Sequence, residues 1–308
     1  MKNNVIIISV YFGSCPEYID LYLKSCSYNP EFSFLIVTDL KIEAKNISNV
    51  SIVNMNLEEF RNKVASELGY SVSIPRGYKV CDFKPTLGVV FREYINEYDF
   101  WGHSDIDLIY GRLSNFLDDI TFDNNDIISM RPWYLTGFLC FYRNSKMINN
   151  LYAKSRDHRK VFESAKNFCF DECNYRWSEL RNGKSILNCS TEIESMTEVI
   201  YKEKQKGKIN ILFLDIARES VDDKNIIWSK GKITEDNNEW ALLHFITLKK
   251  LSFFHFPKWK NVPDVFTISK LGMWKGSRFK ISSVSDLRPI KKMGEVFART
   301  INVLINYK

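Results

Sequence analysis

The stretch Val5-Ile-Ile-Ile-Ser-Val10 is almost entirely apolar and shows no alternation of apolar and polar residues. Such a run is typical of a strand that is buried on both faces, as in a parallel sheet. Apolar runs return over residues 32–38 and 50–53, and helical spacing is found over 17–27 and 57–68. This alternation of strand and helix predicts an α/β fold with a mixed, mainly parallel sheet flanked by helices.

The pattern continues beyond the first third of the chain. The part after these elements is irregular and rich in aromatic residues, which indicates one α/β core with an irregular C-terminal elaboration. The further elements that we expect are a helix over 85–95, a strand over 98–111, a short helix over 113–117, strands over 126–130 and 137–142, and a helix from residue 147.

Composition excludes several classes of protein. With 45% hydrophobic and 26% charged residues among 308, the chain has the balance of a globular protein. No run approaches the ~18 apolar residues of a membrane-spanning helix, and the N-terminus lacks the apolar core of a signal peptide. Seven scattered cysteines favour reduced thiols over a disulfide framework, so we expect a cytoplasmic protein.

The net charge of +6 is concentrated near the C-terminus. Residues 256–308 hold 11 Lys and Arg against 3 Asp and Glu, a balance of +8, so the rest of the chain sums to −2. A nucleic-acid binder would spread positive charge across the fold, and we expect no nucleic acid as partner. We predict a basic terminal amphipathic helix that contacts the inner face of the plasma membrane, or that packs on the body or on a second copy. Its apolar face comprises Ile290, Met293, Phe297, Ile301 and Leu304, flanked by Lys291, Lys292 and Arg299.

Asp105 and Asp107 follow the apolar stretch that starts at residue 98, and they form the sharpest chemical signal in the sequence. Two carboxylates this close are costly when they are desolvated and unpaired, and a divalent cation removes that cost. Carboxylate oxygens suit Mg²⁺ or Mn²⁺. The pattern by itself also fits two solvated acids at a strand end, so the surrounding residues have to decide.

Two further strand ends carry polar or glycine residues. Asp39 follows the strand over 32–38, where its carboxylate can bind ribose hydroxyls or a base N–H. Tyr11 and Gly13 follow the first strand, and a glycine there lets the backbone approach a phosphate or a base. Open α/β sheets bind ligands at the carboxyl ends of their strands, so the three ends together favour a binding site.

In these residues the sequence resembles the GT-A class of nucleotide-sugar-dependent glycosyltransferases, especially a bacterial group among capsule and O-antigen enzymes. The resemblance covers roughly residues 5–256. Its most specific parts are Cys81-Asp-Phe-Lys-Pro85 and Trp101-Gly-His-Ser-Asp-Ile-Asp107. The supporting stretches are Val10-Tyr-Phe-Gly13, Leu21-Tyr-Leu-Lys-Ser-Cys26, Val37-Thr-Asp39, Leu135-Thr-Gly137, Phe170-Asp-Glu172 and His244-Phe245.

The resemblance implies a domain organisation and an activity. A GT-A catalytic domain would span 1–256, with a donor half over about 1–115 and an acceptor half over about 116–256, followed by a basic extension over 257–308. The implied activity is that of a hexosyltransferase that moves a sugar from a nucleotide-diphosphate donor, foremost a UDP-sugar. Its acceptor would be a glycan, free or lipid-linked, in the synthesis of bacterial capsule or O-antigen.

By the same resemblance, Asp105 and Asp107 are the metal-binding acids for Mn²⁺ or Mg²⁺. The metal would offset the charge of the diphosphate as the nucleotide leaves. Members of the class often add a C-terminal histidine as a further ligand. His244 is the candidate and His255 the alternative, and His244 also fits a core histidine because apolar residues flank it.

Several residues are expected at the donor. Asp82 and Lys84 would lie near its ribose or sugar, with Lys84 as a charge for phosphate or a partner for an acid. Asp82 also fits a helix cap. Two lysines that follow His244 would meet phosphate. The expected donor residues are Tyr11, Gly13, Asp39, Asp82, Lys84, Asp105, Lys249 and Lys250.

Transfer with inversion of configuration needs a carboxylate that deprotonates the acceptor hydroxyl. Asp171, ahead of Glu172, is the candidate catalytic base. Both acids also fit the first turn of a helix, where the macrodipole favours negative charge. Inversion is the expectation, although retention would need no base at this place.

The acceptor is expected near residues 133–137. Sugar faces stack on aromatic rings, so a Trp-Tyr pair before a glycine favours an acceptor platform, while aromatic residues equally belong to protein cores. The expected acceptor residues are Trp133, Tyr134, Thr136 and Gly137.

Two other functions are compatible with the same residues. A nucleotidyltransferase or phosphohydrolase would need further acids around a second ion, and pyrophosphate release would identify the former. A Gly-x-x-x-x-Gly-Lys stretch is absent from the sequence, which excludes a P-loop. A non-catalytic glycan- or membrane-binding module would bind a glycan tightly and no nucleotide sugar.

Overall fold

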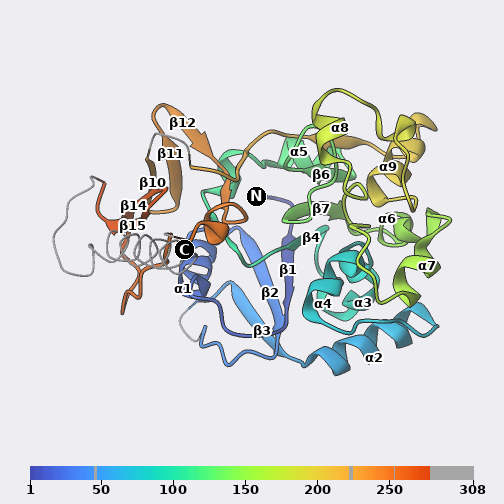
Figure 1. Cartoon of the computed structure of the whole chain (residues 1–308), viewed down its shortest axis with the longest axis horizontal. Coiled ribbons are helices and arrows are strands. Elements are labelled where there is room, and N and C mark those ends of the chain that lie inside the picture. Colours follow the sequence, from blue (N-terminus) through green and yellow to red (C-terminus); the bar gives the residue numbers. More distant parts are fainter. Residues whose placement is uncertain (45–46, 222–224, 253, 278–308) are drawn as a thin grey trace, which may run out of the picture. The chain divides into compact units, whose positions relative to one another are not determined.

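Figure 1 shows the computed structural model of the chain, which describes residues 1–44, 47–221, 225–252 and 254–277. The chain forms two compact units, each drawn from separate segments. The expected boundaries at 115 and 256 do not coincide with these units, and the donor and acceptor halves stay predictions. Unit 1 comprises residues 1–15, 30–106 and 116–216, and unit 2 comprises residues 16–29, 107–115 and those from 217 onward.

A seven-stranded sheet forms the centre of unit 1. Its strands are β1 (Val5–Tyr11), β2 (Phe32–Thr38), β3 (Val50–Asn54), β4 (Phe100–Ser104), β6 (Ile127–Ser129), β7 (Leu139–Arg143) and β8 (Ile211–Phe213). Their order is β3-β2-β1-β4-β7-β6-β8. The first four run parallel, β6 and β8 also pair in parallel, and β7 is antiparallel to both of its neighbours. This confirms the predicted mixed, mainly parallel α/β sheet.

Helices pack on this sheet through one continuous apolar cluster. Phe60 and Val64 of α2 (Leu57–Leu68) belong to the same buried cluster as Ile6 and Ile8 of β1. Complete burial of such a side chain stabilises the fold by about 1.5–3 kcal/mol. The remaining helices of unit 1 are α3 (Leu87–Val90), α4 (Arg92–Ile95), α5 (Asp119–Asn124), α6 (Lys146–Asn149), α7 (His158–Glu163), α8 (Trp177–Arg181) and α9 (Met196–Gln205), with 3₁₀ turns η1 (Gly77–Thr86), η3 (Leu151–Lys154) and η4 (Ile186–Asn188).

Local sequence signals fix the ends of α2. Asn56 caps the helix by accepting hydrogen bonds from the backbone N–H groups of Glu58 and Glu59, and Glu59 returns a bond to the Asn56 backbone. Gly69 ends the helix with φ 77°, a left-handed conformation that glycine adopts without steric cost. A capping box and a C-terminal glycine explain why this helix matches its expected range.

Unit 2 is mostly antiparallel β structure around its own apolar cluster, to which Trp228 and Phe266 belong. A five-stranded sheet has the order β12-β11-β10-β14-β15, and a three-stranded sheet has the order β5-β13-β9. The elements are α1 (Ile19–Ser27), β5 (Leu108–Tyr110), η2 (Leu113–Asn115), β9 (Ala217–Arg218), β10 (Ile226–Ser229), β11 (Lys232–Glu235), β12 (Asn238–Trp240), β13 (Leu242–His244), η5 (Leu248–Lys250), β14 (Val265–Ser269) and β15 (Gly272–Lys275).

Two expected elements are divided in the structure. The strand predicted over 98–111 splits into β4, which pairs in the large sheet, and β5, which pairs with β13. Asp105-Ile-Asp107 forms the break, because the residues on its two sides hydrogen-bond to different sheets. The helix predicted over 85–95 is divided into the end of η1, α3 and α4, with Pro85 inside η1 rather than in a first helical turn.

The predicted amphipathic helix over residues 290–304 lies outside the described residues. Of the helices that the structure describes, none has both the length and the apolar character needed to span a membrane.

Candidate active site

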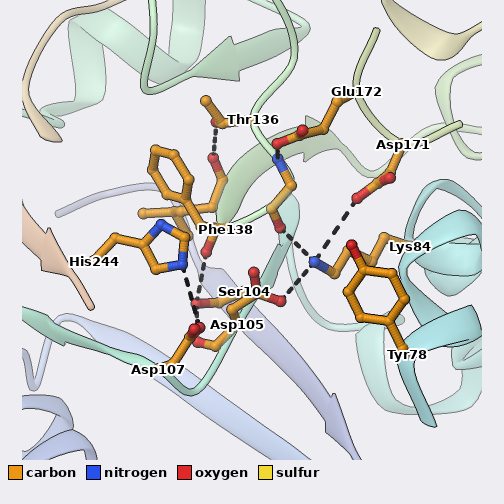
Figure 2. A network of polar contacts seen from close by, with 12 residues as sticks. Tyr78, Lys84, Ser104, Asp105, Asp107, Thr136, Phe138, Asp171, Glu172 and His244 are labelled. Carbon is orange, nitrogen blue, oxygen red and sulfur yellow. Dashed lines mark hydrogen bonds and ion pairs between the residues drawn. The ribbon is translucent and has the colours of Figure 1, made fainter. Parts of the chain in front are cut away.

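Asp105 stands directly after β4 and is held from two directions within unit 1. Its backbone N–H donates to the Phe138 carbonyl at 3.0 Å. Its side chain is 30% exposed and accepts a hydrogen bond of 2.6 Å from the Lys84 ammonium, which also donates to the Gly137 carbonyl at 2.8 Å (Figure 2). Lys84 is itself buried, so the acid keeps a fixed position while one of its sides stays open.

Asp107 begins the part of unit 2 that contains β5, and it meets His244 at the end of β13. The antiparallel register pairs His244 with Leu108, and the Phe245 N–H donates to the Asp107 carbonyl at 2.8 Å. His244 Nε2 lies 3.3 Å from Asp107 Oδ1, and His244 Nδ1 lies 3.3 Å from Glu219 Oε1. A carboxylate on the far nitrogen is the arrangement that orients a metal-binding imidazole.

The charge of Asp107 is strongly favoured. Burial alone would raise the pKa of Asp107, but hydrogen bonds and charges from His244 and Lys249 lower it below its ordinary value. Lys249 donates directly to Asp107 Oδ2. Asp107 is therefore an anion at neutral pH, as a metal ligand has to be.

One oxygen of Asp105, one oxygen of Asp107 and one ring nitrogen of His244 lie within 4.8 Å of one another. Two carboxylates and an imidazole form a donor set that suits Mn²⁺ or Mg²⁺. The residues present therefore fit a divalent cation. His255, the alternative ligand, is not part of this group within the described chain and lies beside Gly272.

Tyr11, Gly13 and Asp39 come together after β1 and β2. The Gly13 N–H donates to Asp39 Oδ1 at 3.3 Å, and the Tyr11 hydroxyl donates to the Ser14 carbonyl at 2.8 Å. Gly13 has φ 134°, which is accessible to glycine and strained for other residues. Asp39 and Gly13 are both exposed, so polar groups lie on the surface at this edge of the sheet.

Asp82 has a different environment from the one expected for a donor residue. Its side chain is fully buried and forms an ion pair of 2.8 Å with Lys79. It also accepts hydrogen bonds from the backbone N–H groups of Phe168 and Phe170. Asp82 therefore joins η1 to the 168–170 backbone and presents no oxygen to solvent, and it caps no helix.

The Asp171–Glu172 pair faces Gly137 and Lys84. Glu172 Oε1 accepts the Gly137 N–H at 2.6 Å, and its Oε2 accepts the Trp177 indole N–H at 2.7 Å. Asp171 Oδ2 lies 3.8 Å from the Lys84 ammonium, and among the described residues Asp171 accepts no side-chain hydrogen bond. A Cβ on Gly137 would come within 2.7 Å of Asp171 Oδ2, so a larger residue there would displace the carboxylate.

Burial dominates the electrostatics of this pair. Desolvation raises the pKa of Asp171 well above its ordinary value, opposed by the charge of Lys84 and reinforced by that of Glu172. The pKa of Glu172 is raised for the same reason, although its bonds to Gly137 and Trp177 oppose the shift. Two raised carboxyl pKa values beside a buried lysine are typical of a functional site.

The backbone around the pair is strained. Cys169, Asn174 and Tyr175 have φ values of 52°, 49° and 63°, in the left-handed region that glycine and asparagine tolerate and that is unfavourable for Cys169 and Tyr175. The expected helix start at residue 171 is wrong, because residues 170–175 form turns and α8 begins at Trp177. Strain of this kind costs about 1–3 kcal/mol per residue and clusters at active sites.

The expected acceptor residues have mixed environments. Tyr134 is buried, and Thr136 is fully buried with its hydroxyl bonded to the Leu139 carbonyl at 2.5 Å. These two residues belong to the core, because their polar groups are satisfied inside the protein. Trp133 is half-buried with Arg181 over its ring, and Gly137 contacts the carboxylates directly.

Lys250 is exposed and lines a cavity of about 360 Å³ in unit 2 together with Lys249, Pro16, Tyr18 and Phe256. Its lining thus combines two lysine ammonium groups with aromatic rings. The sequence carried no signal for Glu219 or Trp177, which contact His244 and Glu172.

Solved structures with a similar backbone include three glycosyltransferase structures. The galactosyltransferase LgtC, in complex with donor and acceptor sugar analogs, is 13% identical, with a TM-score of 0.34 over 52% of this chain and 66% of LgtC. An active-site mutant of LgtC is 10% identical, with a TM-score of 0.38 over 94% of this chain and 95% of the mutant. The apo glycosyltransferase GlyE of Streptococcus pneumoniae TIGR4 is 12% identical, with a TM-score of 0.34 over 68% of this chain and 45% of GlyE.

With TM-scores below 0.5, these likenesses carry no argument about activity. No curated protein matches the chain. One protein-family model matches residues 7–283, which is most of the chain. The chain therefore belongs to that family, DUF6625, a family of unknown function.

Proposed function

We propose that the chain is a metal-dependent glycosyltransferase that transfers a sugar from a nucleoside-diphosphate donor to a glycan acceptor. The observation that carries this proposal is the Asp105–Asp107–His244 group. Asp105 directly follows β4, which runs parallel to β1 and β2. Asp105 therefore shares one sheet edge with Gly13 and Asp39. Ligands of parallel α/β sheets bind at this edge.

The donor would be shared between two sets of residues. Tyr11, Gly13 and Asp39 would bind the nucleoside, and Lys249 and Lys250 would bind the diphosphate. A divalent cation held by the two acids and His244 would supply Lewis-acid stabilisation of the leaving diphosphate. Lys249 neutralises Asp107 in the structure, and we propose that it turns to phosphate when the donor binds.

The acceptor hydroxyl would lose its proton to Asp171 in an inverting transfer. Asp171 has an oxygen that no described hydrogen bond occupies, and its raised pKa makes it a stronger base than an ordinary aspartate. Both oxygens of Glu172 are engaged by Gly137 and Trp177, so Glu172 acts as a positioning residue.

The finer identity rests on the sequence resemblance. We propose a UDP-sugar as donor, Mn²⁺ or Mg²⁺ as metal, and a glycan of bacterial capsule or O-antigen as acceptor. We further propose a cytoplasmic location, with peripheral contact to the inner face of the membrane through the basic C-terminal residues.

Thermal unfolding with UDP, UDP-glucose and UDP-galactose, each with Mn²⁺ and with EDTA, tests the donor and the metal together. A ligand at 100 times its Kd stabilises the folded state by about 2.7 kcal/mol. We expect the nucleotide to raise the melting temperature of wild type only when Mn²⁺ is present. We expect no rise in the melting temperature of Asp107→Asn, which loses the charge of one metal ligand.

Asp264→Asn is the matched control, because Asp264 is a half-exposed acid of unit 2 that pairs with Lys24. It should respond as wild type does. Equal stabilisation of wild type in EDTA would remove the metal from the proposal. In a turnover assay, release of pyrophosphate in place of a nucleoside diphosphate would identify a nucleotidyltransferase instead.

A further inference from the structure

Two exposed tyrosines belong to the segments that hold the Asp171–Glu172 pair. Tyr78 lies in η1, six residues before Lys84, and is 64% exposed. Tyr175 follows Glu172 by three residues and is 44% exposed. Figure 2 draws Tyr78 in the same network as Lys84 and Asp171. A single exposed aromatic residue is ordinary on a protein surface. Two of them on the segments that hold a buried carboxylate pair suggest a binding surface.

The Tyr175 ring is held in place despite its exposure. Its hydroxyl donates to the carbonyl of Asn167 at 2.8 Å and contacts the Asn167 side-chain oxygen at 2.7 Å. The Asn167 amide in turn donates to the Tyr78 carbonyl at 3.5 Å, which ties the two tyrosine segments together. With φ 63°, Tyr175 occupies a backbone conformation that an aromatic residue adopts only under constraint. The exposed ring of Tyr175 is therefore held by a strained backbone conformation.

The Tyr175 ring is linked to the carboxylate of Glu172 through Trp177. Tyr175 packs edge-on against Trp177, with ring centroids 5.5 Å apart, and the Trp177 indole donates to Glu172. Partial burial, followed by charges that include Asp171, raises the pKa of Tyr78 to about 12. Burial raises the pKa of Tyr175 too, and Tyr78 and Asp171 are among the charges that add to that shift. Both phenols are therefore electrostatic neighbours of the candidate base.

We propose that Tyr78 and Tyr175 form the platform that binds a pyranose ring of the acceptor next to Asp171. This rests on the proposed function and replaces Tyr134 and Thr136, which are buried, as the acceptor-binding residues. The CH face of a pyranose stacks on an aromatic ring, and a tyrosine adds a polar edge for hydroxyl groups. Asp171 then lies within the same network as the ring, where its carboxylate can accept a hydroxyl proton.

The test measures sugar binding in the full-length protein without any transfer. Saturation-transfer NMR is recorded with the methyl glycosides of galactose, glucose, mannose, N-acetylglucosamine and rhamnose. At least one glycoside should bind wild type through its CH face. Tyr78→Ala and Tyr175→Asn should each weaken that binding about tenfold, while Tyr78→Phe, which keeps the ring, should bind within about twofold of wild type.

Asn is chosen at position 175 because it tolerates left-handed φ values, so the ring is removed and the backbone is kept. Tyr94→Ala is the matched control, since Tyr94 is 39% exposed on α4 and contacts Phe91. It should leave binding unchanged. Melting curves identify a misfolded variant, and Tyr78→Ala still decides the matter if Tyr175→Asn unfolds.

The platform is refuted if no glycoside binds, if both substitutions leave binding intact, or if a UDP-sugar displaces the glycoside from these rings. Its failure is separable from failure of the proposed function. Stabilisation by UDP-sugar and Mn²⁺ without glycoside binding would reject only the platform. Glycoside binding that depends on Tyr78 and Tyr175, without any response to nucleotide sugars, would reject the transferase and leave a sugar-binding site.

Discussion

Asp171 and Glu172 are adjacent in sequence, but their surroundings give them different roles. Both oxygens of Glu172 accept hydrogen bonds, Oε1 from the Gly137 N–H and Oε2 from the Trp177 indole and the Cys169 thiol. Asp171 is 3% exposed and faces the Lys84 ammonium at 3.8 Å. A carboxylate whose oxygens are already bonded holds structure in place, and one with an open oxygen can receive a proton.

Substitution separates the two roles. Asp171→Asn should lower kcat by about 10²- to 10⁴-fold, the usual effect of losing a general base, with the fold retained. Glu172→Gln places an NH₂ group against one of two N–H donors, so it should destabilise the fold by about 1–3 kcal/mol. Steady-state kinetics and urea unfolding of both variants check this. A stable Glu172→Gln protein with the greater loss of kcat would reverse the assignment.

The pH dependence of stability follows from the raised pKa of Asp171. The folded state binds this proton more tightly than the unfolded state, where the pKa is 3.8. The stabilisation that the group provides is therefore complete below pH 3.8 and is lost as the pH rises through the raised value. As the pH rises through this value, the stability of Asp171→Asn should increase relative to that of wild type. A difference in unfolding free energy between the two proteins that does not change with pH would contradict the argument from burial.

At the scale of elements, the buried Lys79–Asp82 pair fastens η1 to the loop before Asp171. The two side chains are 1% and 0% exposed, and Lys79 also donates to the carbonyls of Val161 and Lys166. Asp82 accepts from the backbone of residues 168–170. Because η1 also carries Lys84, which contacts both Asp105 and Asp171, this pair joins the segments that hold the two acids.

Breaking the pair should be costly. Lys79→Met leaves the Asp82 charge buried without its cation, and removal of one partner from a buried pair costs about 3–5 kcal/mol. Lys63→Met is the control, since Lys63 pairs with the half-exposed Glu93 at 2.6 Å, and an exposed pair is worth less than about 1 kcal/mol. Chemical denaturation measures the unfolding free energy of both variants. Equal losses of stability in Lys79→Met and Lys63→Met would show that burial of the Lys79–Asp82 pair is unimportant.

Some elements could be predicted and others could not. α2 matches its expected range because Asn56, Glu59 and Gly69 are local signals that need no partner. The division of residues 98–111 into β4 and β5 depends on β13, which is more than 130 residues away in the chain. Hydrophobic pattern alone gives one strand there, since both halves are equally apolar.

At the scale of the whole molecule, the basic charge at the C-terminus carries a prediction from sequence alone. Residues 256–308 have a balance of +8, and positive charge near an anionic membrane surface is favourable by about 1 kcal/mol per residue. Deletion of residues 286–308 should abolish sedimentation with anionic liposomes at low salt, while activity on a soluble acceptor persists. Sedimentation that survives the deletion would remove membrane contact from the proposal.

The sequence by itself determined the chemistry at strand ends. Asp39, Asp105 and Asp107 are recognisable because each follows a strong apolar strand, and the parallel order of β1, β2 and β4 follows from helices between such strands. Hydrophobic periodicity is a local property, so it can be recognised in the sequence alone.

Only the tertiary structure decided which polar residues are satisfied inside the protein and which remain open to a ligand. Asp82, Tyr134 and Thr136 have the residue types of a binding site, yet their groups are buried or bonded internally. Glu219 and Trp177 carry no local signal and acquire their roles from His244 and Glu172. The physical reason is that burial and hydrogen-bond partners come from segments distant in sequence, which no local pattern records.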